Sequence, residues 1–168
     1  MNVGIVFGCF IPLHKGHISL INRAITENDV VIIGVCGFDS DRGKDFIPFR
    51  KRIELMQEKY QDRKNVVVVS VDDEKLGLTG KFDLDSWELW CNELFNNADM
   101  DPLENSYTWY VGEQPYACSI KQLYPSHKFV IADRSVIDIS GTKIREYFKR
   151  YERFIDGIFY KYLEERGG

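Results

Sequence analysis

Two histidines and a lysine lie within one short stretch, Gly8-Cys-Phe-Ile-Pro-Leu-His-Lys-Gly-His17, between a predicted strand and a predicted helix. If the helix begins near Pro12–Lys15, His14 and His17 lie three residues apart on one side of its first turn. The free N–H groups and the dipole at a helix N-terminus favour an anion. Two imidazoles and Lys15 would add donors to phosphate oxygens, so the stretch predicts a phosphate-binding turn.

The glycines and the proline of this stretch also fit a phosphate-binding turn. Gly8 lets the chain leave the strand tightly, Pro12 stiffens the loop, and Gly16 permits close packing or the close approach of a ligand. One alternative is that the histidines only cap the helix or lie on the surface. Another is a His-x-x-His metal pair, for which no third cluster of His or Cys stands out.

Alternating strand and helix patterns surround the turn and must position it. Short apolar or β-branched runs predict five strands, at Val3–Phe7, Val30–Val35, Val66–Val71, Trp109–Val111 and Lys128–Ile131. Stripes of apolar residues predict five helices, at His17–Glu27, Phe49–Tyr60, Leu84–Ala98, around Cys118–Leu123, and from Ser140 to about Leu163. This alternation predicts right-handed βαβ crossovers and an α/β, Rossmann-like, doubly wound domain. We expect a parallel sheet in the order 3-2-1-4-5, with helices on both faces and ligands at the carboxyl ends of its strands.

Length and composition fit one domain over residues 1–168 and exclude several classes of protein. With 22 basic and 26 acidic residues the formal net charge is −4, which argues against coating of nucleic acid. The composition is 44% hydrophobic, so disorder is not expected. The four cysteines form no C-x-x-C pair, and no apolar run is long enough to cross a bilayer. Without a recognisable signal peptide, a cytoplasmic protein is the simplest expectation.

The first stretch has the pattern G-x-F-x-P-x-H-x-G-H, which resembles the signature of the nucleotidyltransferase superfamily. A second signature of that superfamily, I-S-x-T-x-I-R, is matched by Ile139-Ser-Gly-Thr-Lys-Ile-Arg145 at the opening of the last helix. The resemblance implies catalytic roles for His14, His17 and Arg145. It implies nucleotide or phosphate binding by Gly8, Phe10, Lys15, Gly16, Ile139, Ser140, Thr142 and Lys143. For the second stretch alone, an ordinary capped helix with exposed basic residues is the alternative.

Three further features resemble the NMN adenylyltransferase branch of that superfamily. Trp87-Glu-Leu-Trp90 resembles a Trp-x-x-Trp pair, of which we expect Trp87 to stack on the nicotinamide ring and Trp90 to lie in the core. Arg52, after Pro48, resembles an arginine that reaches bound nucleotide, and an exposed arginine on a helix face is the alternative. Arg134, within Asp133-Arg134, resembles a residue near the substrate phosphate, with a different spacing. The alternative is that both tryptophans are core residues on one face of the helix.

The resemblance implies an enzyme that joins ATP and NMN to give NAD and pyrophosphate, with Mg²⁺ bound through the phosphates and no direct protein ligand. Its partners would be these small molecules and not nucleic acid or a membrane, and a homo-oligomer is conceivable. The bifunctional relatives continue into a ribosylnicotinamide kinase domain, and no Walker motif occurs in these 168 residues. The alternatives are another acceptor (nicotinate mononucleotide, phosphopantetheine or a polyol phosphate) and a nucleotide sensor without catalysis.

Overall fold

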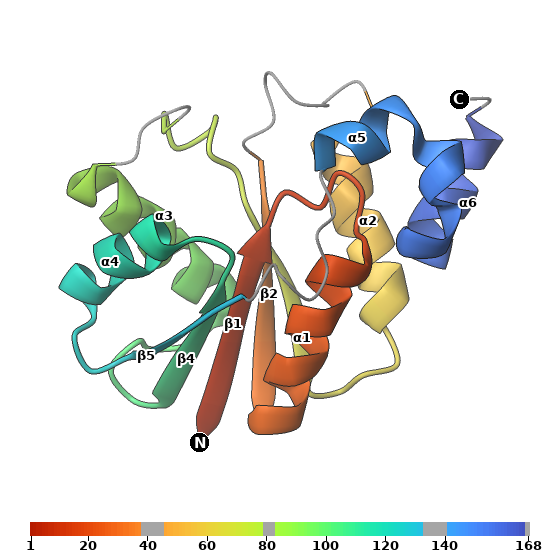
Figure 1. The fold of residues 1–168 in the computed structure, drawn as a ribbon. Helices are drawn as coiled ribbons and strands as arrows, with labels where there is room; N and C mark the ends of the chain where they lie inside the picture. The colour runs from red at the N-terminus through yellow and green to blue at the C-terminus, as the bar shows by residue number, and fades with distance from the viewer. Residues whose placement is uncertain (38–45, 79–82, 133–140, 167–168) are drawn as a thin grey trace.

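The protein is built on a five-stranded parallel sheet in the order β3-β2-β1-β4-β5 (Figure 1). The computed structural model describes residues 1–37, 46–78, 83–132 and 141–166. Its strands are β1 (Asn2–Gly8), β2 (Val30–Cys36), β3 (Val66–Val71), β4 (Ser106–Val111) and β5 (Lys128–Ile131). All four strand pairings are parallel, which confirms the predicted fold class and strand order. The order reverses between β1 and β4, so a ligand crevice is expected beyond the carboxyl end of β1.

Helices cover both faces of the sheet (Figure 1). The helices are α1 (Lys15–Glu27), α2 (Phe49–Tyr60), α3 (Leu84–Ala98), α4 (Gln114–Leu123), α5 (Gly141–Glu146) and α6 (Gly157–Glu165). Successive residues of a strand point to opposite faces. Ile5 therefore joins a core under α3 and α4, whereas Val6 joins a second core under α1, α2 and α6. No described helix is long and apolar enough to cross a membrane.

The C-terminal segment departs from the predicted run of helix from Ser140 to about Leu163. It contains α5, a 3₁₀ helix η1 (Phe148–Phe154) and α6. Ile155 has an extended backbone, with φ −90° and ψ 139°, and Asp156 then caps α6 by accepting from the N–H groups of Ile158 and Phe159. The apolar periodicity of the sequence continues through this segment and does not indicate where the helix stops. The extended backbone at Ile155 ends η1, and the cap by Asp156 begins α6.

A buried histidine joins β4 to the loop that precedes it. The indole N–H of Trp109 donates to Nδ1 of His127 at 3.0 Å, and Nε2 of His127 lies 2.8 Å from the carbonyl of Pro102. The neutral ring therefore carries its proton on Nε2 and donates it to Pro102. Burial lowers the pKa of His127, and the Pro102 carbonyl opposes that shift. A second proton on Nδ1 would remove the acceptor for the Trp109 indole N–H and place two donors against each other.

This arrangement predicts that acid destabilises the protein through His127. Its pKa in the fold lies below the ordinary value of 6.5, so its full contribution to stability is present above pH 6.5 and is lost as the pH falls. In His127→Gln, the amide can accept from Trp109 and donate to Pro102 without titrating. Urea unfolding at several pH values from neutral to acid should show a smaller loss of stability in the variant than in the wild type. An equal loss in both proteins would contradict this prediction.

Candidate active site

The turn after β1 has a backbone conformation that few residues adopt. Phe10 has φ +55°, in the left-handed region, although its bulky side chain is buried. Such a conformation costs about 1–3 kcal/mol, and residues that adopt it cluster at functional sites. A Cβ at Gly8 would lie 3.2 Å from the Phe10 ring, so glycine is the residue that best allows this ring to pack against the end of the strand. The Phe10 ring in turn meets His17 edge-on at 5.0 Å.

His14 and His17 cap the beginning of α1 reciprocally. His14 is the N-cap residue, and its Nδ1 accepts from the backbone N–H of Gly16 at 3.0 Å. The backbone N–H of His14 donates to Nδ1 of His17 at 3.3 Å. The two rings stack with centroids 3.8 Å apart and an angle of 22° between their planes. Two of the N–H groups that a helix start leaves unsatisfied are thus bonded to imidazoles.

These bonds fix the tautomers of both histidines. Because each Nδ1 accepts a backbone proton, each neutral ring carries its own proton on Nε2. The Nε2–H groups are then the donors that the two stacked rings can offer to an anion. Gly16 is required for this geometry, because a Cβ there would lie 2.8 Å from Cε1 of His14. The sequence analysis named capping by the histidines as an alternative to phosphate binding, and the structure shows that both histidines do cap the helix. The reciprocal arrangement of the two caps was not indicated by the sequence.

Arg145 lies beside the same turn. Its Nη1 donates to the carbonyl of Ile11 at 3.2 Å, so a residue 134 positions away along the chain joins the loop that carries the histidines. The two motifs are therefore in contact through this hydrogen bond. The backbone of Thr142 and Lys143 belongs to α5. The predicted site residues Arg134, Ile139 and Ser140 lie outside the described residues.

The junction between η1 and α6 supports the turn from another side, which the sequence did not indicate. His14 and Ile155 form an antiparallel bridge, and the N–H of Asp156 donates to the carbonyl of Leu13 at 2.9 Å. Buried Asp156 also forms an ion pair with Lys59 of α2, with Nζ and Oδ1 2.6 Å apart. In the sequence, an aspartate just before a helical pattern indicates the cap of α6 by Asp156. The hydrogen bond from Asp156 to Leu13 joins distant parts of the chain, so no local pattern indicates it.

Arg52 is buried to 0% exposure at the carboxyl ends of β1 and β2. Its Nη1 donates to the carbonyls of Cys9 and Cys36 at 2.6 and 2.8 Å, and its Nε donates to the carbonyl of Ile47 at 3.1 Å. The alternative of an exposed arginine on a helix face is therefore wrong. A buried guanidinium needs several acceptors to offset its lost hydration, and here backbone carbonyls are among them. Arg52 thereby joins the start of the turn to the neighbouring strand.

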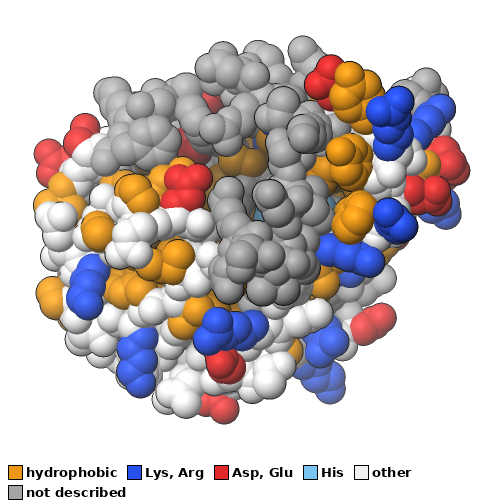
Figure 2. Space-filling view, in the orientation of Figure 1, with side chains coloured by type: hydrophobic (Ala, Val, Ile, Leu, Met, Phe, Trp, Pro, Cys, Tyr) orange, Lys and Arg blue, Asp and Glu red, His pale blue; other side chains and the backbone are white. Residues whose placement is uncertain are grey.

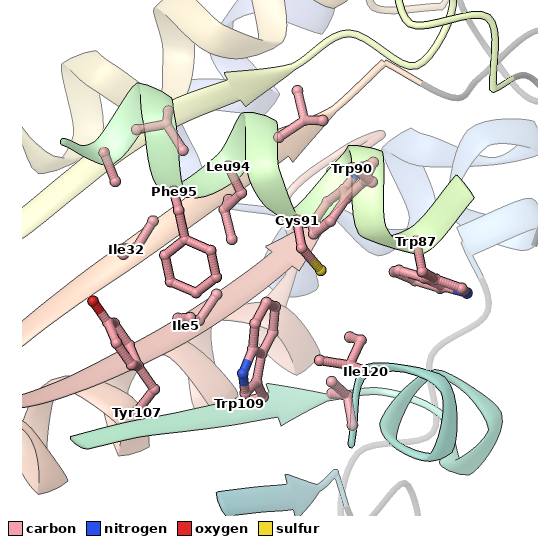
Figure 3. Close-up of a cluster of buried hydrophobic side chains, with 14 of the residues drawn as sticks. Ile5, Ile32, Trp87, Trp90, Cys91, Leu94, Phe95, Tyr107, Trp109 and Ile120 are labelled. Atoms are coloured by element: carbon pink, nitrogen blue, oxygen red, sulfur yellow. The ribbon is translucent and has the colours of Figure 1, made fainter. Parts of the chain in front are cut away.

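Trp87 and Trp90 both lie in the core between the sheet and α3, with exposures of 8% and 7% (Figure 3). Their rings meet at 5.7 Å, and Phe7 of β1 contacts Trp90 at 4.9 Å and Trp87 at 6.1 Å. Tyr116, near the start of α4, lies 5.5 Å from Trp87. Burial alone does not separate the two tryptophans, so stacking of Trp87 on a substrate ring stays a prediction. Phe7 and Tyr116 were not recognised from the sequence as members of this aromatic cluster.

The described residues include no group of three or more His, Cys, Asp or Glu side chains that could hold a metal ion. All four cysteines are free thiols. Burial is the largest cause that raises the pKa of the Cys36 thiol, followed by its neighbours Cys9 and Asp73. Cys36 is therefore a protonated core residue under ordinary conditions. The chemistry available at the turn is that of imidazole N–H donors with nearby cations.

The chain is similar to several curated proteins. It is 26% identical over 163 residues to the "Trifunctional NAD biosynthesis/regulator protein NadR" of Salmonella typhimurium, covering 92% of this chain and 38% of that protein. The Escherichia coli protein of the same name is 29% identical over 91% of this chain, which again spans 38% of it. A phosphopantetheine adenylyltransferase of Bacteroides thetaiotaomicron is 36% identical over 72 residues, or 43% of this chain and 46% of that protein. The chain thus spans about two fifths of the two NadR proteins.

Solved structures have the same fold. A NadR protein crystallised in complex with NR superposes with a TM-score of 0.79 and 34% identity, covering 94% of this chain and 44% of that one. A bifunctional NMN adenylyltransferase/ADP ribose pyrophosphatase from Francisella tularensis superposes with a TM-score of 0.69 at 20% identity, over 98% of this chain and 49% of that one, which shows the fold alone. The model of the cytidylyltransferase-like family matches residues 5–147, a span that includes the histidine turn and Arg145. The chain therefore belongs to the cytidylyltransferase-like family.

Proposed function

We propose that this domain is a nicotinamide-nucleotide adenylyltransferase, which converts ATP and NMN into NAD and pyrophosphate. The observation that carries the proposal is the pair of stacked imidazoles, each with its proton on Nε2, at the start of α1. This pair stands beyond the carboxyl end of β1, where the strand order reverses and α/β sheets bind nucleotides. The similarity to NadR proteins along more than nine tenths of the chain supports NMN as the acceptor.

In the proposed reaction, an oxygen of the NMN phosphate attacks the α-phosphorus of ATP in line. A new P–O bond forms, the bond from the α-phosphorus to the bridging oxygen breaks, and pyrophosphate leaves with that electron pair. An ionised phosphate is already a nucleophile, so no general base is required. Catalysis then consists of positioning the two substrates and stabilising charge on the transferring phosphate.

Each residue of the turn has a role in this proposal. His17 donates its Nε2–H to the α-phosphate, whose negative charge grows in the transition state. His14 and Lys15 contact oxygens further along the phosphate chain, and Arg145 and the second motif hold the β and γ groups. ATP enters as its Mg²⁺ complex, in which the ion neutralises phosphate charge while keeping most of its waters. The donor set of the turn suits phosphate oxygens rather than a metal ion.

The acceptor specificity is proposed from the aromatic cluster. We expect the nicotinamide ring to stack on Trp87, because a flat cationic ring is attracted to an aromatic face. Arg52 supports this side of the site by holding the carboxyl ends of β1 and β2 together through the carbonyls of Cys9 and Cys36. The partial similarity to phosphopantetheine adenylyltransferase favours that acceptor as the second candidate. A linear pantetheine chain offers no ring for Trp87, so NMN is preferred.

Purified protein should release pyrophosphate from MgATP with NMN, and with NMN more efficiently than with phosphopantetheine or polyol phosphates. His17→Ala should reduce kcat by about 10²–10³, the contribution of one donor aimed at developing charge. A coupled assay for pyrophosphate measures the rate of turnover, and chromatography identifies NAD as the product. Wild-type turnover in the variant would contradict the role of His17. Tight nucleotide binding without turnover of any acceptor would instead indicate a sensor.

The stacking of Trp87 predicts a selective effect on the acceptor. Trp87→Ala should raise the KM for NMN on the order of tenfold, as expected for loss of an aromatic face under a cationic ring, with little change in the KM for ATP. Trp90→Phe is the matched control, because it changes a neighbouring indole of the same cluster while keeping an aromatic ring. Steady-state kinetics with each substrate varied in turn give the two constants. Equal increases for ATP and NMN in Trp87→Ala would move the nicotinamide contact elsewhere.

A further inference from the structure

The end of η1 runs alongside the histidine turn. The antiparallel bridge between His14 and Ile155 places the residues before Ile155 next to those after His14. Asp156 strengthens this alignment, because its N–H donates to the carbonyl of Leu13 and its carboxylate is held by Lys59 and by the N-terminus of α6. Residues 153 and 154 therefore occupy a fixed position beside the start of α1.

Two cations meet at one ring in this position. Nζ of Lys15 lies 5.6 Å from the centroid of the Phe154 ring, and the guanidinium carbon of Arg153 lies 5.2 Å from the same centroid. Each contact is a cation–π interaction, and together they hold two like charges near each other. No ion pair between described residues involves Lys15 or Arg153, whereas Lys59 and Arg23 each have a carboxylate partner.

A third positive feature coincides with these two side chains. Lys15 is the first residue of α1, where the helix dipole is positive and a lysine is electrostatically unfavourable. The first turn contains no acidic residue that would offset it. Figure 2 shows further Lys and Arg side chains on the side of the molecule where α5 and α6 lie. In a protein with a net charge of −4, the meeting of Lys15 and Arg153 beside a helix N-terminus favours an anion with several negative oxygens.

We propose that Arg153 is a further nucleotide-binding residue, which contacts the terminal phosphates of ATP together with Lys15. The inference rests on the proposed function, because these phosphates are the group that leaves as pyrophosphate. A guanidinium can donate two parallel N–H bonds to phosphate oxygens, and the Phe154 ring limits the positions that its side chain occupies. Neither of the two sequence motifs contains Arg153, which comes to lie beside the turn through the tertiary bridge between His14 and Ile155.

Titration calorimetry with pyrophosphate and Mg²⁺ tests this inference without any need for turnover. Arg153→Gln should weaken pyrophosphate binding about tenfold, the lower end of what one charged hydrogen bond contributes, and Arg153→Lys should recover part of the loss. Arg150→Gln is the matched control. Arg150 is an exposed arginine of the same 3₁₀ helix, and it also stacks on an aromatic ring, that of Tyr147 at 5.1 Å. In turnover, Arg153→Gln should raise the KM for ATP and leave the KM for NMN within about twofold of the wild type.

The outcomes separate this inference from the proposed function. Unchanged pyrophosphate affinity in Arg153→Gln, an equal loss in Arg150→Gln, or no binding by the wild type would each overturn the role of Arg153. Selective weakening in Arg153→Gln supports it, even if the protein transfers adenylate to no acceptor and the proposed function fails. Adenylyl transfer to NMN with normal pyrophosphate binding by Arg153→Gln would leave the proposed function intact and remove this inference alone.

Discussion

The reciprocal cap between His14 and His17 is the interaction on which the rest of the site depends. A helix start leaves backbone N–H groups without partners, and in most proteins a serine, threonine or carboxylate satisfies them. Here two imidazoles do so, and the Nδ1 atoms that accept from Gly16 and His14 leave the ring protons on Nε2. One set of bonds thus stabilises the helix and orients two donors. In the proposed function, the N-terminus of α1 therefore serves both folding and ligand binding.

Elements distant in sequence hold this cap in place. Arg52 of α2 ties the turn to β2 through backbone carbonyls, Arg145 of α5 donates to Ile11, and the bridge to Ile155 fixes the backbone of His14. The left-handed backbone at Phe10 is tolerated because its ring is buried between Gly8 and His17. A site that binds a polyphosphate gains from such rigidity, since donors placed in advance need not reorganise when charge develops.

The fold followed from the sequence because each buried strand and amphipathic helix has a local pattern, and the handedness of βαβ crossovers leaves few topologies. The histidine turn followed from residue types at fixed spacing. The hydrogen bonds of buried Arg52 to backbone carbonyls could not be predicted from the sequence. An arginine in an amphipathic helix has the same local sequence pattern whether its side chain is exposed or buried. The contact between Asp156 and Leu13 and the meeting of Lys15 and Arg153 at Phe154 are equally invisible, since they arise only when the C-terminal segment packs beside the turn.

Backbone N–H groups fix both histidines with their ring protons on Nε2. Long-range ¹H–¹⁵N correlation spectra of the free protein at a pH of about 8, where imidazoles are neutral, measure the tautomer of each ring directly. The signals that disappear in His127→Gln belong to His127, so the remaining imidazole signals belong to His14 and His17. We expect His14 and His17 both to have an unprotonated Nδ1 and a protonated Nε2. A protonated Nδ1 in either ring, or rapid exchange between tautomers, would contradict it.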